Sequence, residues 1–218
     1  MRRRGILAVL LSLLFCLTVD CAAAQTALQL LCQQQNVKNP DVIAWLEIPG
    51  AEISEPVLCH PEDDGYYAKR SADGYGSAYG SLYIQAKYNA GDFSDPVTII
   101  YGNSLSTSAP FGMLQELYSG SFSQCQSFYL HTQEATQEYA VFAAIPYSSV
   151  HILHYNNFLN ERRYQKFFDD VFSTRALGMH LDEDNRPVAG KDRVLILSTG
   201  LRGDPLQRYL VMAKLIVK

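Results

Sequence analysis

The sequence predicts a mainly β domain with helices: a closed or nearly closed β-barrel with one long helix lying across it. Roughly eight short apolar runs have the composition and the bounding turns of β-strands. The clearest helical periodicity falls late in the chain, in residues 164–172, just before the last strands. The 218 residues are 48% hydrophobic and 18% charged, which is typical of one globular domain with a real core.

The N-terminus has the pattern of a secretory leader over residues 1–24. Arg2–Arg4 supply a positive start, Gly5–Val19 are apolar, and three alanines ending at Ala24 form a small-residue cleavage site. The pattern favours cleavage after Ala24. The alternative is an uncleaved membrane anchor, although the apolar stretch is shorter than the roughly 20 residues that a membrane span needs. Both readings predict that the rest of the chain is exported.

Helix and hairpin signals follow the leader. Leu28, Leu31 and Cys32 have helical spacing and predict an N-terminal helix within residues 25–38. Asn39-Pro40 has the pattern of an N-cap followed by proline in a first helical turn. "AWLEIPGAEISEPVL" then predicts two strands joined by a type II turn at Pro49-Gly50. A Gly/Tyr/Ser loop over residues 73–85 leads into the next strand; it lacks the spacing of a phosphate-binding loop.

The second half of the chain predicts strands around two helices. The long helix carries Tyr164, Phe167, Phe168, Val171 and Phe172 on one face, which indicates core packing. The remaining predicted elements are a strand at 96–102, a short helix in "FGMLQELY", a hairpin of "SFYLHT" with "EYAVFAAIPY", and two final strands in "RVLILST" and "RYLVMAKLIV".

Charge and cysteine content exclude several classes of protein. The net charge of −4, with no Lys/Arg cluster beyond the first residues, argues against nucleic-acid binding. Outside the leader, Cys32, Cys59 and Cys125 are an odd number with no C-x-x-C spacing, so neither a disulfide scaffold nor a zinc site is indicated. Three small buried side chains are favoured over one oxidised pair.

Two further patterns resemble metal sites, and neither is favoured as one. His151 and His154 form H-x-x-H, but the flanking residues are typical of a loop or a strand. The acidic segment 182–186 lacks the glycine and the terminal glutamate of a calcium loop, which favours a solvated turn. The sequence therefore predicts no metal or other cofactor.

The chain contains six motifs in this order: "NPDVIAWLEIPGAEISEPVL", "DDGYYAKR", "GSLYI", "VTIIYGNS", "FGMLQEL" and "LSTG…RYLVMAKL". In their order and spacing they resemble the class B sortases, over nearly all of residues 39–218. Sortases are membrane-anchored cysteine transpeptidases of Gram-positive bacteria that attach secreted proteins to the cell wall or to a pilus subunit. The resemblance implies an eight-stranded β-barrel domain over residues 39–218, with an N-terminal helical addition and a long helix before the final strands.

The family's chemistry needs three side chains, and this sequence keeps one of them. In family members a cysteine thiolate attacks the scissile carbonyl, a histidine protonates the leaving amine, and an arginine stabilises the oxyanion. The resemblance assigns the arginine role to Arg208. It places Gly200 at the cysteine position and Asn103 at the histidine position. Glycine offers no nucleophile, and asparagine cannot titrate, so it cannot act as a general acid.

No other residue is favoured as a replacement for the absent cysteine nucleophile or histidine general acid. Cys59 and His60 are neighbours on a predicted strand, where successive side chains point to opposite faces. Cys125 lies far from the motifs in sequence. Ser104 and Ser198 are hydroxyls near the expected site, yet neither has an evident base.

We therefore expect a cell-surface pseudo-sortase that binds a sorting-signal peptide or a secreted surface protein in the inherited cleft. Ser198, Thr199 and Ser104 are the candidate substrate-binding residues beside Arg208, and Trp45 and the tyrosines of residues 66–88 either line a peptide groove or pack. The alternatives are an active cysteine transpeptidase and a purely structural envelope protein. An uncleaved leader would add contact with the membrane.

Overall fold

Eight strands close into a barrel. A computed structural model describes residues 27–120 and 126–216 of the chain. Hydrogen bonding links the strands in the order β5-β1-β2-β3-β4-β8-β9-β6, and an additional β5–β6 pairing completes the ring. β7 pairs only with β6 and stands outside the ring. The predicted eight-stranded barrel is confirmed, and the short β7 is an addition that the sequence did not indicate.

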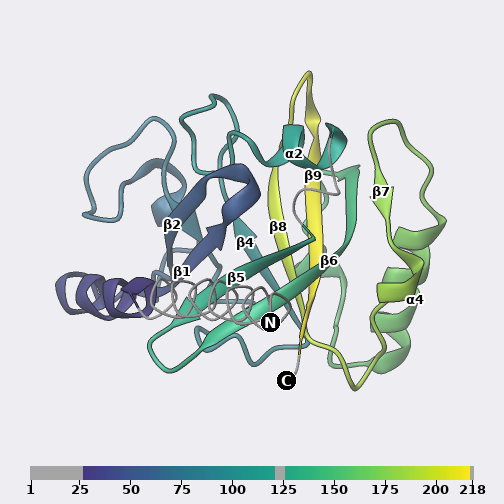
Figure 1. The fold of residues 1–218 in the computed structure, drawn as a ribbon, viewed down its shortest axis with the longest axis horizontal. Coiled ribbons are helices and arrows are strands. Elements are labelled where there is room, and N and C mark those ends of the chain that lie inside the picture. The colour runs from purple at the N-terminus through teal and green to yellow at the C-terminus, as the bar shows by residue number, and fades with distance from the viewer. Residues whose placement is uncertain (1–26, 121–125, 217–218) are drawn as a thin grey trace, which may run out of the picture.

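The predicted elements lie close to their expected bounds. Figure 1 shows α4 along one side of the barrel and the N-terminal helix of residues 27–38 on the opposite side of the view. The strands are β1 Val42–Ile48, β2 Ile53–Leu58, β3 Leu82–Tyr83, β4 Val97–Tyr101, β5 Ser127–Thr132, β6 Thr136–Ser148, β7 His180–Leu181, β8 Val194–Leu201 and β9 Asp204–Leu215. The helices are η1 Pro49–Ala51, η2 Tyr66–Lys69, α2 Leu114–Gly120, α3 Ile152–Tyr155, α4 Glu161–Ser173 and η4 Glu183–Asn185.

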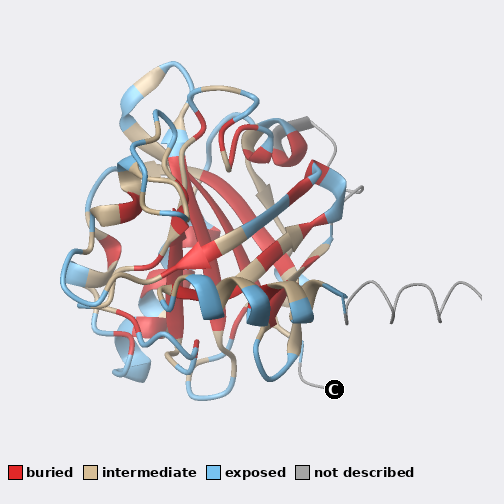
Figure 2. Cartoon of the chain, turned by 90° about the vertical axis from the view of Figure 1, so that its left-hand side faces the viewer, coloured by how far each residue is buried: buried red, intermediate tan, exposed pale blue. Residues whose placement is uncertain are grey.

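Two cores explain why β4 and β8 are apolar on both faces. One face of β8 carries Leu195 and Leu197 into the barrel interior, and the other carries Val194 and Ile196 toward α4. Figure 2 shows buried residues concentrated on the barrel strands and exposed ones on the loops. Because β4 and β8 pair in parallel and are covered on both sides, their near-continuous apolar sequences are expected.

Helix α4 forms as its periodicity predicts. Asn160 is the N-cap, and its side chain accepts a hydrogen bond from the amide of Arg163 at 3.1 Å. The five predicted aromatic and aliphatic residues of its apolar face are all buried. Burial of one such side chain contributes about 1.5–3 kcal/mol, so the packing of this face against the barrel outweighs helix propensity.

Two local predictions are wrong. Asn39-Pro40 begins no helix; the Asn39 side chain instead donates to the Tyr67 hydroxyl at 2.9 Å and to the Ala72 carbonyl at 2.7 Å, and the chain turns into β1. Pro49-Gly50 does join the β1–β2 hairpin, but as a 3-10 turn in which Glu52, at φ 53°, takes the left-handed conformation. Long-range partners of Asn39 caused the first error, because no local pattern reveals them.

The N-terminal helix is tied to the barrel near the β5–β6 turn. The side chains of Gln29 and Gln33 both donate to the carbonyl of Gln133, at 3.1 and 2.9 Å, and Cys32 is fully buried. The predicted leader lies outside the described residues. In the part of the chain that the structure describes, no helix is both long enough and apolar enough to cross a membrane.

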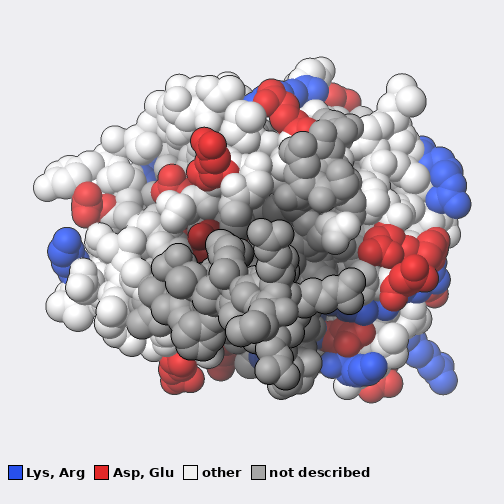
Figure 3. All heavy atoms as spheres, viewed as in Figure 1, with Lys and Arg blue, Asp and Glu red and all other residues white. Residues whose placement is uncertain are grey.

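Charged side chains of both signs are interspersed on the face shown in Figure 3. Where described residues form this face, the Lys and Arg side chains gather into no continuous basic area. The net charge of the whole chain is −4. Neither observation favours a nucleic-acid partner.

Candidate functional site

A cavity of about 280 Å³ lies where β4 and β8 end beside the first half of β9. Asn103 follows β4, and Gly200 and Arg208 are directly paired across the antiparallel strands β8 and β9. The three residues thus meet although about 100 positions separate the first from the other two in the sequence. The cavity is lined by Ala68, Tyr79, Ser81, Tyr83, Tyr101, Gly102, Asn103, Ser104, Leu105, Gly200 and Arg208.

Arg208 is held in place by Ser198. Its Nε donates to the Ser198 hydroxyl oxygen at 2.6 Å, and its Nη2 donates to the Ser198 carbonyl at 3.3 Å. The guanidinium carbon stands 5.4 Å from the centroid of the Tyr101 ring. Burial lowers the pKa of Arg208, and the phenols of Tyr101 and Tyr83 oppose that shift. The guanidinium remains a fixed cation at neutral pH.

Gly200 occupies a position that a larger residue could fill. A Cβ built on it would have only the Ser104 hydroxyl oxygen nearby, at 4.0 Å, and Gly200 does not have a positive φ. Its carbonyl accepts a hydrogen bond from that hydroxyl at 2.9 Å. Neither space nor backbone conformation therefore requires glycine at the end of β8.

Gly102, which begins the loop after β4, is constrained in the opposite way. A Cβ there would lie 2.4 Å from the Phe111 ring and 2.6 Å from a Leu82 methyl. The amide of Gly102 donates to the Ser198 carbonyl at 3.1 Å. Close packing therefore requires glycine here, and it fixes the start of the segment that carries Asn103.

Asn103 is anchored by its own loop. Its side-chain oxygen accepts from the amide of Leu105 at 2.7 Å, and its carbonyl accepts from the amide of Phe111 at 2.9 Å. The side-chain NH₂ group is left as a donor at the cavity. Asn103 can therefore orient a ligand by hydrogen bonding, but it has no proton to exchange near neutral pH.

Tyr83 and Tyr101 form an aromatic wall of the cavity; Tyr83 belongs to the tyrosine-rich segment 66–88, whereas Tyr101 was not predicted from the sequence. Their rings stack with centroids 5.5 Å apart. Burial raises the pKa of Tyr101 to about 12, with Arg208 opposing the shift, and burial also raises the pKa of Tyr83. Both phenols stay protonated and can donate hydrogen bonds. Strand alternation could have indicated where Tyr101 points, because it lies two residues after Ile99 and therefore on the same side of β4, the side that faces α4.

The three predicted substrate-binding residues have different positions. Ser104 lines the cavity, whereas Ser198 acts through its two hydrogen bonds to Arg208. Thr199 is fully buried and pairs with Tyr209, which belongs to the core of the barrel interior. The Thr199 side chain therefore lies on the face of β8 opposite the cavity. Their roles in binding stay predictions.

The cysteine candidates are not placed for catalysis. Cys59 packs against the barrel core, while the His60 ring stacks on Tyr66 with centroids 4.2 Å apart. Burial raises the pKa of the Cys59 thiol, and Asp41 and Asp64 add to the rise, so the thiolate is disfavoured. Cys32 and Cys59 are both free thiols, and Cys125 lies outside the described residues.

The H-x-x-H motif caps a helix. The prediction of loop or strand at this point is wrong, because residues Ile152–Tyr155 form α3 with His151 as its N-cap. The His151 Nδ1 accepts from the amide of His154 at 3.0 Å, and its Nε2 lies 2.8 Å from the Gln85 side-chain oxygen. Among the described residues, no group of three His, Cys, Asp or Glu side chains is arranged to hold a metal ion.

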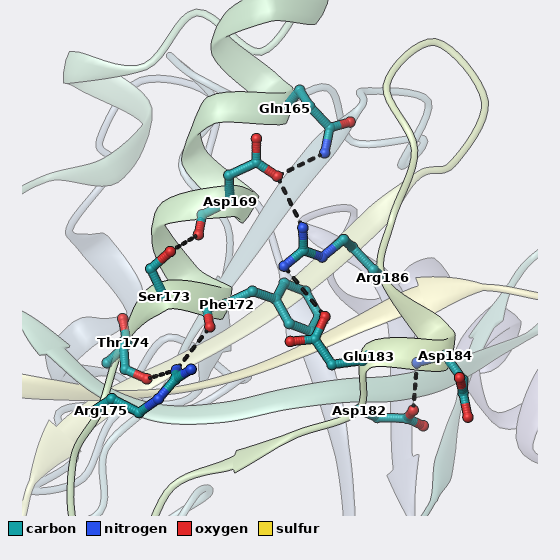
Figure 4. A network of polar contacts seen from close by, with 10 residues as sticks. All are labelled: Gln165, Asp169, Phe172, Ser173, Thr174, Arg175, Asp182, Glu183, Asp184 and Arg186. Carbon is teal, nitrogen blue, oxygen red and sulfur yellow. Dashed lines mark hydrogen bonds and ion pairs between the residues drawn. The ribbon is translucent and has the colours of Figure 1, made fainter.

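The acidic segment 182–186 docks on α4. Figure 4 shows Arg186 between Asp169 of α4 and Glu183 of η4, with ion pairs of 3.3 Å to each. Its guanidinium also lies 4.3 Å from the centroid of the Phe172 ring. Asp182 caps η4 by accepting from the amide of Asp184 at 3.1 Å. The segment is a docked 3-10 turn that packs the β7 connection against α4.

Trp45 and the tyrosine-rich segment separate in space. The Trp45 indole on β1 donates to the Ser54 hydroxyl of β2 at 2.9 Å, within that hairpin. Tyr79 and Tyr83 line the cavity. Tyr66 and Tyr67 pack edge to face with centroids 4.9 Å apart and lie outside the lining set. Only part of the tyrosine-rich segment contributes to the candidate site.

Comparisons with known proteins agree with this architecture. No family model matches the chain. Sortase B of Staphylococcus aureus (strain NCTC 8325 / PS 47) is 22% identical over 181 residues, which cover 82% of this chain and 71% of that protein.

Solved structures of class B sortases have the same fold. A mutant sortase B of Clostridium perfringens has a TM-score of 0.72 at 20% identity, covering 85% of this chain and 86% of that one. The Staphylococcus aureus sortase B-substrate complex has a TM-score of 0.72 at 20% identity, covering 89% and 94%. A Streptococcus pyogenes class B sortase involved in pilus biogenesis has a TM-score of 0.69 at 21% identity, covering 84% and 97%. The chain is therefore a distant homologue of sortase B that has the fold of the class B sortases.

Proposed function

We propose that this chain is an exported pseudo-sortase: it keeps the cleft of the class B sortases, binds a peptide there and performs no transpeptidation. One observation carries the proposal. Among the described residues that line the cavity there is no cysteine and no histidine, and the two positions that would supply them hold Gly200 and Asn103. The cavity that contains Arg208 therefore has neither a thiol nucleophile nor a general acid among its described lining residues.

The size of the expected loss supports an inactive protein. Removing the nucleophile alone from a hydrolase costs about 10⁶-fold in turnover, and a second loss adds little because the groups act as a unit. The cavity serines are not evident substitutes, since Ser104 donates its proton to the Gly200 carbonyl and Ser81 donates to the Arg70 carbonyl. No histidine lines the cavity within the described residues to activate them.

Peptide binding is proposed on two grounds. The cavity combines an aromatic wall with several hydrogen-bond donors, the composition expected of a ligand site. In addition, a solved structure of Staphylococcus aureus sortase B is a complex with its substrate. The leader pattern of residues 1–24 supports a cell-surface location, with an exported sorting-signal peptide or surface protein as the ligand.

The test compares chemistry and binding in one preparation. The purified protein is incubated with a sorting-signal peptide that the Staphylococcus aureus enzyme cleaves in parallel, and both are examined by mass spectrometry. We expect intact peptide, no acyl-enzyme and measurable peptide binding. An acyl adduct on any residue would indicate an active transpeptidase, and absence of binding would instead support a structural envelope protein.

A further inference from the structure

Arg208 is the one charged side chain among the described residues that line the cavity. No ion pair joins it to a carboxylate in the described part of the chain. Burial lowers the pKa of Arg208, and the phenols of Tyr101 and Tyr83 raise it. Partly buried charges in proteins are normally paired, because removal from water is costly without a partner. The cleft therefore holds a cation that forms no ion pair with any carboxylate of the described residues; Asp64 acts on the same two phenols only electrostatically.

The groups around Arg208 are mostly hydrogen-bond donors. Its Nε and Nη2 are used by Ser198, while Nη1 has no hydrogen-bond partner among the described residues. The Asn103 side chain uses its oxygen within the loop and keeps its NH₂ group. The phenols of Tyr83 and Tyr101 stay protonated because burial raises the pKa of both. Such a set complements an acceptor-rich, negatively charged group.

Gly200 leaves room for that group beside the guanidinium. It is paired with Arg208 across the strands, and a Cβ on Gly200 would find only the Ser104 hydroxyl within 4.0 Å. The cavity volume of about 280 Å³ is just below the roughly 300–1,000 Å³ of small-ligand sites, which suits the last residues of a peptide. No acidic side chain of the described lining repels an anion there.

We propose that the cleft recognises a free carboxylate at the end of its peptide ligand, held by Arg208 in the space that Gly200 leaves open. The inference rests on the proposed function and narrows its ligand to peptides that end in a free acid. No bond is made or broken in this recognition. A peptide that runs through the cleft uncut would offer Arg208 only a neutral carbonyl, which is the weaker partner.

The test uses two pools of fluorescein-labelled five-residue peptides with randomised sequence, identical except that one ends in a free carboxylate and the other in a carboxamide. Binding to the full protein is measured by fluorescence anisotropy. We expect the acid pool to bind at least about tenfold more tightly, since hydrogen bonds to charged groups contribute more than neutral ones. The preference should fall as the salt concentration rises.

Two variants locate the effect. Arg208→Gln keeps hydrogen-bonding capacity and removes the charge, so the acid and amide pools should bind equally. Lys214→Gln removes one positive charge from the same strand, outside the cavity lining, and should keep the preference. Thermal unfolding of both variants checks that they fold. If Arg208→Gln does not fold, Arg208→Lys is the alternative variant. It keeps the charge but cannot form the two parallel hydrogen bonds that a guanidinium makes to a carboxylate, so the preference for the acid pool should be smaller.

The outcomes separate the two proposals. Equal binding of acid and amide pools by the unmodified protein would overturn carboxylate recognition and leave peptide binding in place. Binding of neither pool would overturn the proposed function itself, and carboxylate recognition with it. An acid preference that persists in a folded Arg208→Gln variant would also overturn the assignment to this residue.

Discussion

Gly200 and Arg208 face one another across the antiparallel strands β8 and β9. The pairing brings the Arg208 cation to the end of β8, where Gly200 supplies no side chain. Ser198, two residues earlier on the same face, holds the guanidinium through its hydroxyl and its carbonyl. The cavity is therefore built around Arg208, and the scaffold does not require the end of β8 to lack a side chain.

Gly200 can be replaced without strain, and Gly102 cannot. Gly200→Ala should raise the free energy of unfolding by about 0.5 kcal/mol, because it restricts the unfolded chain and meets no close contact. Gly102→Ala should lower it by about 1–3 kcal/mol, because its Cβ would lie 2.4 Å from Phe111. Urea denaturation of the two variants measures both. A loss of stability in Gly200→Ala as large as that in Gly102→Ala would contradict the geometry.

Adding the two missing groups should install some transpeptidase chemistry. In Asn103→His with Gly200→Cys, the new thiol would stand beside the guanidinium of Arg208, which favours the thiolate. We expect an acyl-thioester on residue 200 by mass spectrometry after incubation with a sorting-signal peptide. Gly200→Cys alone should be alkylated by iodoacetamide near neutral pH, faster than Cys59, whose thiol pKa burial raises.

The control for that experiment is Gly200→Ser with Asn103→His. It offers a hydroxyl in place of the thiol and should form no acyl adduct, because the serine hydroxyl is a far weaker nucleophile than a thiolate. If the cysteine-containing double variant folds, is alkylated at residue 200 and still gives no acyl-thioester, the three positions do not form a competent set.

Short-range patterns predicted the elements of this fold, and long-range partners decided what they missed. The spacing from Tyr164 to Phe172 identified α4, and the apolar runs identified β4, β8 and β9. The parallel β4–β8 pairing, which joins the Asn103 loop to Gly200, left no local signal, because short-range patterns do not specify which strands pair. The two-residue strand β7 is likewise too short for any periodicity to reveal.

The candidate site, like the fold, could be predicted only in part from the sequence. Sequence motifs identified Asn103, Gly200 and Arg208 because they stand in ordered positions of a family pattern. The stacked phenols of Tyr83 and Tyr101 depend on a cross-strand pairing between β3 and β4, which residue types alone do not specify. Ser198 was expected to touch substrate; its contact with Arg208 follows from side-chain alternation on paired strands, once the register of β8 and β9 is known.

Thr199 carries a buried hydroxyl that costs stability. Within the described part of the chain its Oγ1 has no hydrogen-bond partner, and the residue is fully buried. Thr199→Val replaces the hydroxyl with a methyl group of similar shape, so the free energy of unfolding should rise by about 1 kcal/mol. Thr199→Ser keeps the hydroxyl and loses the methyl, and it should be destabilised instead. A destabilised Thr199→Val in thermal or urea unfolding would show that the hydroxyl is satisfied.

His131 should make the fold less stable below neutral pH. The ring is fully buried on β5; its Nε2 lies 3.1 Å from a Glu47 carboxylate oxygen, and its Nδ1 lies 2.9 Å from the Thr136 hydroxyl. With Nε2 protonated, the neutral ring donates to Glu47 and accepts from Thr136, so both nitrogens are satisfied without a charge. Burial lowers the pKa of His131 below 6.5, and Glu47 opposes part of that shift.

Because the unfolded chain takes up the proton more readily than the folded one, stability from this group is present above pH 6.5 and is lost as the pH falls below it. One such histidine contributes a slope of at most about 1.4 kcal/mol per pH unit. Urea denaturation at pH 7.5, 6.5 and 5.5 should show a smaller loss in His131→Gln than in the unmodified protein. His151 and His180, whose pKa values burial also lowers, account for a remaining slope of the same sign. Glu47→Gln should increase the loss of stability at low pH, because the Glu47 carboxylate opposes the effect of burial on the pKa of His131. If neither variant changes the slope, His131 titrates alike in the folded and unfolded chain.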